Sequence, residues 1–75
     1  MIAELDIVAL TTNLPQHRLT VGDVGAVVHV YDSNDAYEVE FVTGSGRTVA
    51  VITVADSDVR PIQNDEILHV RGLAA

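Results

Sequence analysis

The chain has 75 residues, of which 48% are hydrophobic and 4% aromatic, and eleven acidic side chains against four basic ones give it a formal net charge of −7. A chain of this length has room for one domain, residues 1–75, and buries only roughly 60% of the surface that its unfolded form exposes. Because cysteine is absent, disulfides and thiolate metal sites are excluded, and the acidity disfavours sequence-independent binding to DNA or RNA, which depends on Lys and Arg.

The first part of the chain predicts a strand followed by a long loop. Residues 5–10 form an apolar run that is too short for a helix and is apolar enough to be covered on both faces of a sheet. Residues 11–23 contain Pro15 and only two leucines to anchor them. We therefore expect a loop, and a loop of this length often carries function.

A second strand is predicted over residues 24–31. Its alternation places Val24, Ala26, Val28 and Val30 on one side, which we expect to face inward. Gly25 lies inside this strand, where a missing side chain indicates a bulge, a sharp bend or the close approach of another backbone. Together with Gly22 in the preceding turn, it is expected to be a structural residue that lets the chain enter a strongly bent strand.

Two further strands follow at short spacing. Residues 37–43 alternate, with Glu38 and Glu40 expected to point to water, and the polar turn at 32–35 joins them to the second strand as an antiparallel hairpin. The turn at 44–47 leads into residues 48–54, which are apolar on both faces.

The C-terminal part of the chain completes a small all-β domain. Residues 56–62 are too short for a helix and too rich in turn residues for a strand, which predicts a 3₁₀ turn with Pro61 as a structural residue. Residues 67–70, within 65–71, form either one helical turn or a fifth strand that pairs with the first. The predicted fold is a small SH3-like, partly open barrel of about five strands, with a long loop after the first strand and a 3₁₀ turn before the last element.

Four blocks of the sequence resemble a known family. They are residues 5–10, residues 21–31 with the Gly-Asp-Val-Gly sequence, residues 36–41 with Tyr-Glu-Val-Glu-Phe, and residues 59–61. Together they resemble DUF4926, a bacterial family of small proteins catalogued as a domain of unknown function. The resemblance implies an SH3-like barrel and implies no activity. Residues 22–28 alone also resemble the KOW element of ribosomal and transcription-factor barrels, which are typically basic.

The polar residues predict neither a metal site nor an active site. His17, His29 and His69 match no ligand spacing, and His29 is expected at the surface beside Glu38 or Glu40. The acidic turn at 32–35 is not followed by the ligands that a calcium loop needs. No serine lies in a nucleophile elbow, and Glu38 and Glu40 form a wet stripe without an apolar pocket. We expect a protein that is not an enzyme and has no metal or cofactor.

The apolar content suggests an association surface. Val8, Leu10, Val27, Val42 and either Val49 with Val51 or Ala50 with Ile52 lie opposite the expected inward set. An exposed patch of this kind marks a contact surface, whereas bent strands and the long loop could instead cover it. We predict self-association or binding of a partner protein, with Val27, Val42 and Val51 at the contact.

The sequence therefore predicts a non-catalytic protein–protein interaction module, either a homo-oligomer or an accessory or neutralising partner of another, basic, protein. The expected partner-binding residues, chosen by analogy with other SH3-like barrels, are Gln16, His17, Arg18, Tyr31, Asp32, Glu38 and Glu40. The alternatives are a nucleic-acid- or ribosome-associated KOW-like barrel and a non-catalytic subunit of an enzyme.

The cellular location is expected to be cytoplasmic. Residues 1–6 contain two acids and no basic residue, unlike a secretory signal peptide. No apolar run approaches the ~20 residues of a membrane span, so no membrane partner is expected.

Overall fold

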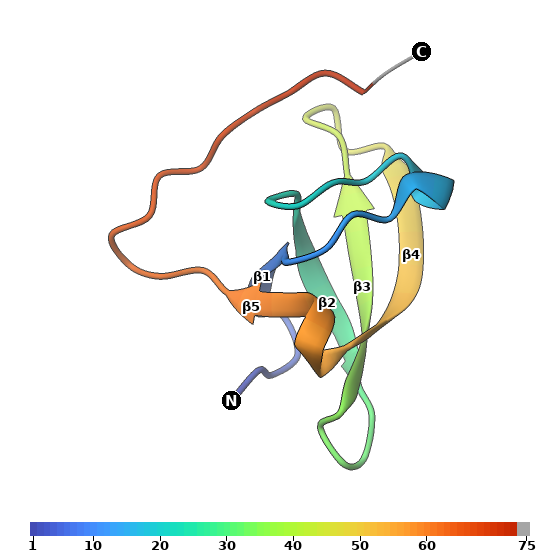
Figure 1. Cartoon of the computed structure of the whole chain (residues 1–75), viewed down its shortest axis with the longest axis vertical. Helices are drawn as coiled ribbons and strands as arrows, with labels where there is room; N and C mark the ends of the chain where they lie inside the picture. The colour runs from blue at the N-terminus through green and yellow to red at the C-terminus, as the bar shows by residue number, and fades with distance from the viewer. Residues whose placement is uncertain (74–75) are drawn as a thin grey trace.

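The computed structural model describes residues 1–73 and contains five strands and two short 3₁₀ helices (Figure 1). The strands are β1 (Ile7–Leu10), β2 (Val24–Val30), β3 (Ala36–Val42), β4 (Thr48–Ala55) and β5 (Val59–Pro61), and the helices are η1 (Pro15–His17) and η2 (Asp56–Asp58). All strand pairs are antiparallel, in one open sheet of order β4-β3-β2-β1-β5. In Figure 1, β5 runs across the direction of β3 and β4, because the sheet is strongly twisted. The predicted all-β fold of about five strands, with a 3₁₀ turn before the last one, is confirmed.

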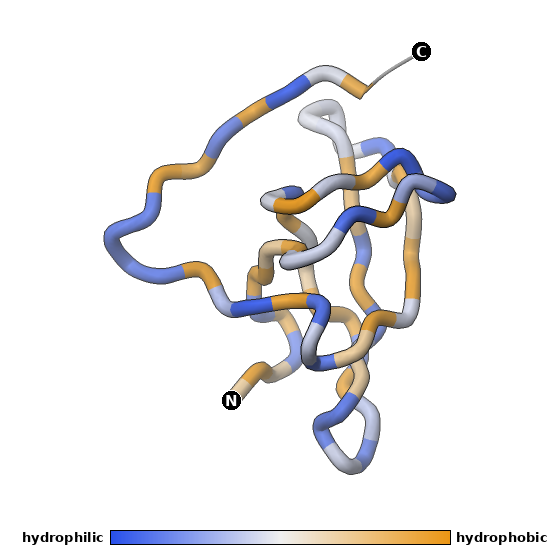
Figure 2. Tube along the Cα trace, in the orientation of Figure 1, coloured by the Kyte–Doolittle hydropathy of each residue, from blue (hydrophilic) through white to orange (hydrophobic). Residues whose placement is uncertain are grey.

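Strand β3 supplies the centre of the hydrophobic core. Tyr37, Val39 and Phe41 are at most 2% exposed, and the intervening Glu38 and Glu40 lie on the opposite face, as the alternation predicts. The buried apolar residues around them are Ile2, Val8, Leu10, Leu19, Val27, Val54 and Val59. Figure 2 shows that hydrophobic residues are concentrated in the strands and hydrophilic residues in the connecting turns.

A β-bulge in β2 changes which of its residues face the core. The register pairs Val27 with Val39 and then His29 with Glu38, so that Val28 is an extra residue without a partner on β3. Val27 is therefore fully buried and Val28 is 42% exposed. The expected inward positions of Val24, Ala26 and Val28 are wrong, because Ala26 lies opposite Glu40 and strict alternation does not allow for the bulge. The expected outer position of Val27 is wrong as well, so the buried Val27 does not lie at the predicted contact surface.

Strand β1 is covered on both faces. It lies between β2 and β5, and Val8, Ala9 and Leu10 are at most 3% exposed. The suggestion that Val8 and Leu10 contribute to an exposed patch is wrong for this reason. Both-sided burial of this strand is what its continuous apolar run predicts.

Glycine is required at two positions around the start of β2. A Cβ atom at Gly25 would lie 2.6 Å from Val39 Cγ1 and 2.9 Å from the carbonyl oxygen of Glu40, which is the close approach that the sequence predicts. Gly22 has φ of +91°, in the left-handed region that favours glycine, and its N–H donates to the carbonyl of Leu10 at 2.9 Å.

The strand that pairs with β1 is not the one expected. Residues 59–61 form β5, with Val59 opposite Leu10 and Pro61 opposite Val8. Proline is tolerated there because β5 is an edge strand. Residues 67–70 form neither a strand nor a helical turn. We call residues 62–73 the C-terminal strap. Because β5 already pairs with the edge of β1, the strap does not pair there and instead runs along the side of the sheet (Figure 1).

Candidate functional site

Strands β2, β3 and β4 present one face to solvent that combines apolar and acidic side chains. We call this the outer face. Its exposed apolar side chains are Tyr31, Val28, Val42 and Val51, which are 39%, 42%, 52% and 47% exposed. The strand register places Glu40 beside Val51, and Glu38 between His29 and Thr53. The two glutamates therefore lie among exposed apolar groups, and the predicted position of His29 beside Glu38 is confirmed.

Hydroxyl groups from both sides hold the two carboxylates of the outer face. Glu38 Oε1 accepts hydrogen bonds from Thr53 Oγ1 at 2.5 Å and from Tyr31 Oη at 3.4 Å. Glu40 Oε2 accepts one from Thr48 Oγ1 at 2.8 Å. In the described part of the chain neither carboxylate forms an ion pair, so each keeps lone pairs that a cationic partner can use.

The aromatic side chain at the end of β2 is also held in place. The rings of His29 and Tyr31 meet edge to face, with their centroids 4.7 Å apart and an angle of 84° between the planes. Together with the bond from Tyr31 to Glu38, this contact gives the outer face an ordered aromatic group. Asp32 follows Tyr31 in the turn between β2 and β3.

The predicted binding loop lies away from this hairpin turn. Figure 1 places η1, with Gln16 and His17, at the opposite end of the sheet from the turn that contains Asp32. The structure therefore does not bring Gln16 and His17 together with Tyr31 and Asp32, and the role of both groups in partner binding stays a prediction. The loop closes on itself through backbone hydrogen bonds between Leu14 and Leu19, and the buried Leu19 anchors it over the far end of the core.

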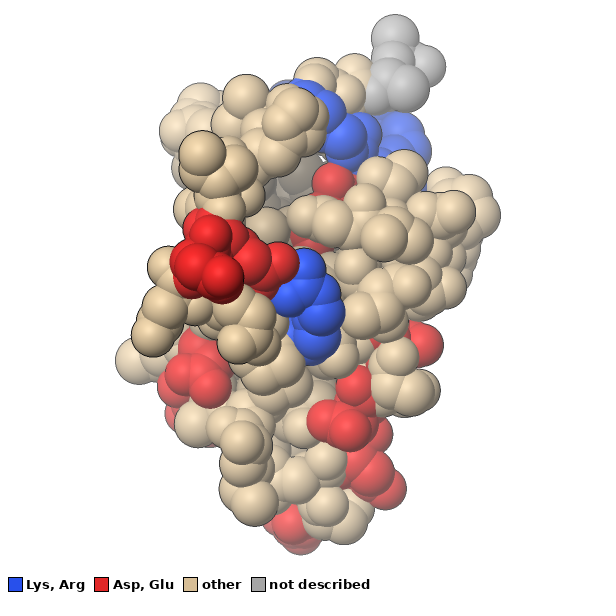
Figure 3. Space-filling view, turned by 60° about the vertical axis from the view of Figure 1, so that its left-hand side comes forward, with Lys and Arg blue, Asp and Glu red and all other residues tan. Residues whose placement is uncertain are grey.

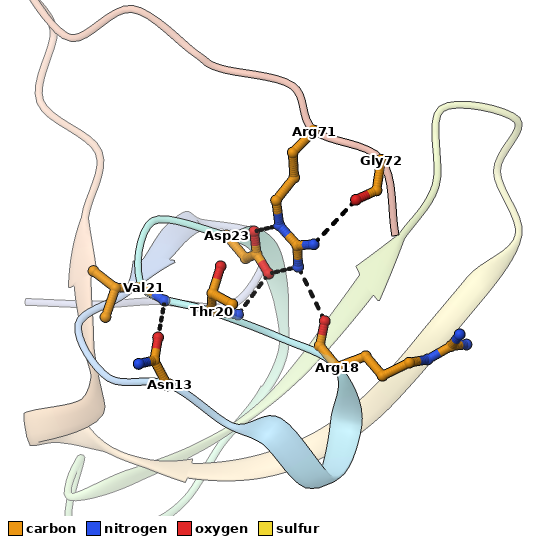
Figure 4. A network of polar contacts seen from close by, with 7 residues as sticks. All are labelled: Asn13, Arg18, Thr20, Val21, Asp23, Arg71 and Gly72. Atoms are coloured by element: carbon orange, nitrogen blue, oxygen red, sulfur yellow. Dashed lines mark hydrogen bonds and ion pairs between the residues drawn. The ribbon is translucent and has the colours of Figure 1, made fainter. Parts of the chain in front are cut away.

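An ion pair fastens the C-terminal strap to the turn before β2 (Figure 4). Arg71 donates from Nε to Asp23 Oδ1 at 2.8 Å and from Nη2 to Asp23 Oδ2 at 2.5 Å. Its Nη2 also donates to the carbonyl of Arg18 at 3.0 Å, and Asp23 Oδ2 accepts from the backbone N–H of Thr20 at 2.8 Å. The hydrogen bond from Arg71 lowers the pKa of Asp23 below its ordinary value.

Asp23 and Arg71 are 48 positions apart and belong to no motif, so no signal in the sequence indicates this contact. A second ion pair holds the start of the strap, where Arg60 donates to both carboxylate oxygens of Glu66 at 2.8 and 2.6 Å. The bond from Arg60 lowers the pKa of Glu66 to about 2. Between the two ion pairs, the strap leaves Ile67, Leu68 and Val70 exposed.

A groove of about 490 Å³ lies between the strap and the sheet. Its lining includes Val24 and Val42 from the outer face, Phe41 from the core, and Val70 and Arg71 from the strap. The strap therefore borders the outer face at the end where β2 begins and β3 ends.

Charge is distributed unevenly over the molecule. In the view of Figure 3, acidic side chains are spread from just below the uppermost basic group down to the lower end, and basic side chains lie near the middle and at the top. Among the arginines, at least Arg60 and Arg71 are paired with carboxylates of the same chain.

The histidines are dispersed over three elements. His17 lies in η1, His29 in β2 and His69 in the strap. Within residues 1–73, no group of three or more His, Cys, Asp or Glu side chains is arranged to hold a metal ion. None of the helices in that part of the chain is long and apolar enough to cross a membrane.

Comparison with known proteins gives one family. Residues 4–61 match the family model described as "Domain of unknown function (DUF4926)". No curated protein and no solved structure matches the chain. The match ends at Pro61, the last residue of β5, so that the strap lies outside it.

Proposed function

The chain belongs to the DUF4926 family, and from that premise we propose that it is a non-catalytic protein–protein interaction module that binds a basic protein through the outer face of β2, β3 and β4. In this proposal it acts in the cytoplasm as an accessory or neutralising partner.

The observation that carries the proposal is the combination of exposed apolar and oriented acidic groups on the outer face. Val42 and Val51 offer apolar area, and Glu38 and Glu40 are held by hydroxyl groups without being neutralised. Apolar contact surrounded by polar groups is the usual anatomy of a protein interface. A net charge of −7 would steer a basic partner toward this face.

The charges of the chain give less support to the alternative of a nucleic-acid-binding barrel. At least two of the four arginines, Arg60 and Arg71, are engaged with Glu66 and Asp23 and are not available to neutralise phosphates. The alternative of an enzyme subunit is compatible with the outer face, and the identity of the bound protein would distinguish it.

The test is capture of the partner by the tagged chain from its own cell extract, with and without nuclease. We expect a basic protein to be retained after nuclease treatment. The variant Glu38→Gln/Glu40→Gln should retain at least about tenfold less of it, because both oriented charges are lost.

A matched control separates the outer face from net charge alone. Glu4→Gln/Asp65→Asn changes the formal charge by the same amount at exposed positions away from β3, and it should capture the partner like the wild type. Equal capture by the outer-face variant would contradict the proposal, and equal loss in both variants would show that only the overall charge matters.

A further inference from the structure

The two edges of the sheet differ in how well they are protected against pairing with another strand. β5 has three residues, two of which are Arg60 and Pro61. Short length, charge and proline all discourage pairing with another chain. β4 has eight residues, all of them Thr, Val, Ala or Ile, and therefore has neither charge nor proline. Only the β4 edge is a long, uncharged template for a further strand.

The hydrogen-bond pattern shows which backbone groups of β4 are free. The N–H of Asp56 donates to the carbonyl of Asp35, which makes these two residues a hydrogen-bonded pair. Such pairs alternate along an antiparallel ladder, so Val54 and Ile52 also bond to β3, whereas the N–H and C=O groups of Val51 and Thr53 point away from it. In residues 1–73, no strand other than β3 pairs with β4.

We infer that β4 pairs antiparallel with β4 of a second copy of this chain, which joins the two sheets in a two-fold symmetric dimer. Placing Val51 of one copy opposite Thr53 of the other satisfies the free backbone groups of both residues in both chains. This dimer adds to the proposed function a second copy of the chain as a partner, bound at the β4 border of the outer face. It rests on the proposed function only in that the chain is taken to be an interaction module.

The charges at the two ends of β4 favour a second copy of this chain as the partner and favour antiparallel pairing. Arg47 directly precedes β4, and Asp56 and Asp58 directly follow it in η2. Antiparallel pairing brings the Arg47 of each copy to the acidic end of the other, so that the attraction occurs twice. The same pairing covers part of Val51, which is 47% exposed in the single chain. Glu38 and Glu40 lie one strand away from the junction, on β3, which limits repulsion between the two acidic chains.

Sedimentation equilibrium over a range of concentrations tests the dimer. The full chain should show a monomer–dimer equilibrium, and Val51→Lys should raise the dissociation constant at least about tenfold, because lysine on an edge strand opposes strand pairing. Val28→Lys is the matched control, since Val28 is an exposed valine of the outer face that lies in β2 and not on the edge. It should leave the dissociation constant unchanged.

Two outcomes would overturn the inference. A wild-type chain that stays monomeric at every concentration would show that the dimer does not form. An equal increase of the dissociation constant in Val51→Lys and Val28→Lys would show that the contact lies on the outer face and not at the β4 edge. Because Glu38→Gln/Glu40→Gln leaves the edge of β4 intact, its dimer should persist, so a failure to capture a partner and a failure to dimerise can be told apart.

A charge exchange tests the antiparallel direction independently. Arg47→Glu and Asp58→Arg should each weaken the dimer, because each places like charges at both ends of the junction, and the double variant should restore it. Neither side chain forms an ion pair in the described chain. Additive weakening in the double variant would contradict the proposed direction.

Discussion

Gly25 is the residue at which the fold depends most clearly on a missing side chain. The space that a Cβ atom would need is occupied by Val39 and Phe41 side chains and by the backbone oxygen of Glu40. A flexible side chain could move aside, but the carbonyl belongs to the β2–β3 ladder and can move only with β3. The close contact of the two strands at this point therefore requires glycine.

We predict that Gly25→Ala lowers the free energy of unfolding by about 1–3 kcal/mol through overpacking, and that Gly25→Val lowers it further. Chemical denaturation followed by circular dichroism measures the change. Gly44→Ala is the control, because no atom lies within 4 Å of the Cβ position at Gly44, and it should change the stability by no more than about 0.5 kcal/mol. An unchanged midpoint for Gly25→Val would show that β3 yields at this position.

The C-terminal strap is connected to the rest of the molecule by ion pairs rather than by strand pairing. It forms no strand or helix, and it is held by the ion pairs of Arg71 with Asp23 and of Arg60 with Glu66 and by the bond from Arg71 to the carbonyl of Arg18. Asp23 is the less exposed carboxylate of the two and also accepts the N–H of Thr20. It therefore joins the strap to the turn from which β2 begins.

We predict that Asp23→Asn lowers the free energy of unfolding at pH 7 by about 1 kcal/mol, since it removes a charge-assisted pair that is only partly buried. The folded-state pKa of Asp23 is lowered, so its contribution is present above the ordinary carboxyl pKa of about 4 and is lost as the pH falls through the folded value. Urea unfolding at neutral and acid pH should show the difference between wild type and variant shrinking below about pH 4.

The matched control is Asp65→Asn, a strap carboxylate that does not contact Arg71. It should be as stable as the wild type at neutral pH. A gap between Asp23→Asn and the wild type that stays constant down to low pH would show that the ion pair does not stabilise the fold.

For the whole molecule, the charge balance limits the class of partner. Eleven acids face four arginines, and two of these arginines, Arg60 and Arg71, already have intramolecular partners. Binding to a polyphosphate would require four arginines to overcome the repulsion of eleven acids. A basic protein meets no such repulsion.

We predict no measurable binding to duplex DNA or single-stranded RNA at physiological salt. Fluorescence polarisation with labelled oligonucleotides is the measurement, and lowering the salt should not produce binding. Micromolar binding that weakens as salt increases would contradict this prediction and would favour the KOW-like barrel as the function.

The all-β class, the two hairpins and the special position of Gly25 could be predicted from the sequence. These features depend on local information, because turn residues and alternation of side chains act over a few neighbouring positions. The same alternation along β3 placed Glu38 and Glu40 on the outer face correctly. The two acidic residues of the candidate site could therefore be predicted from one strand.

The bulge in β2, the partner of β1 and the attachment of the strap could not be predicted from the sequence. The bulge at Val28 reverses the alternation of β2 and buries Val27. No residue type at that position indicates a bulge in the sequence. Residues 67–70 are more apolar than residues 59–61, yet residues 59–61 pair with β1, because they follow directly after η2 at the edge of that strand. The bond between Asp23 and Arg71 joins positions 48 residues apart, whose meeting depends on the path of the whole chain. Local propensity cannot determine such contacts, because each one depends on which of several distant segments packs against the same strand or turn in the folded chain.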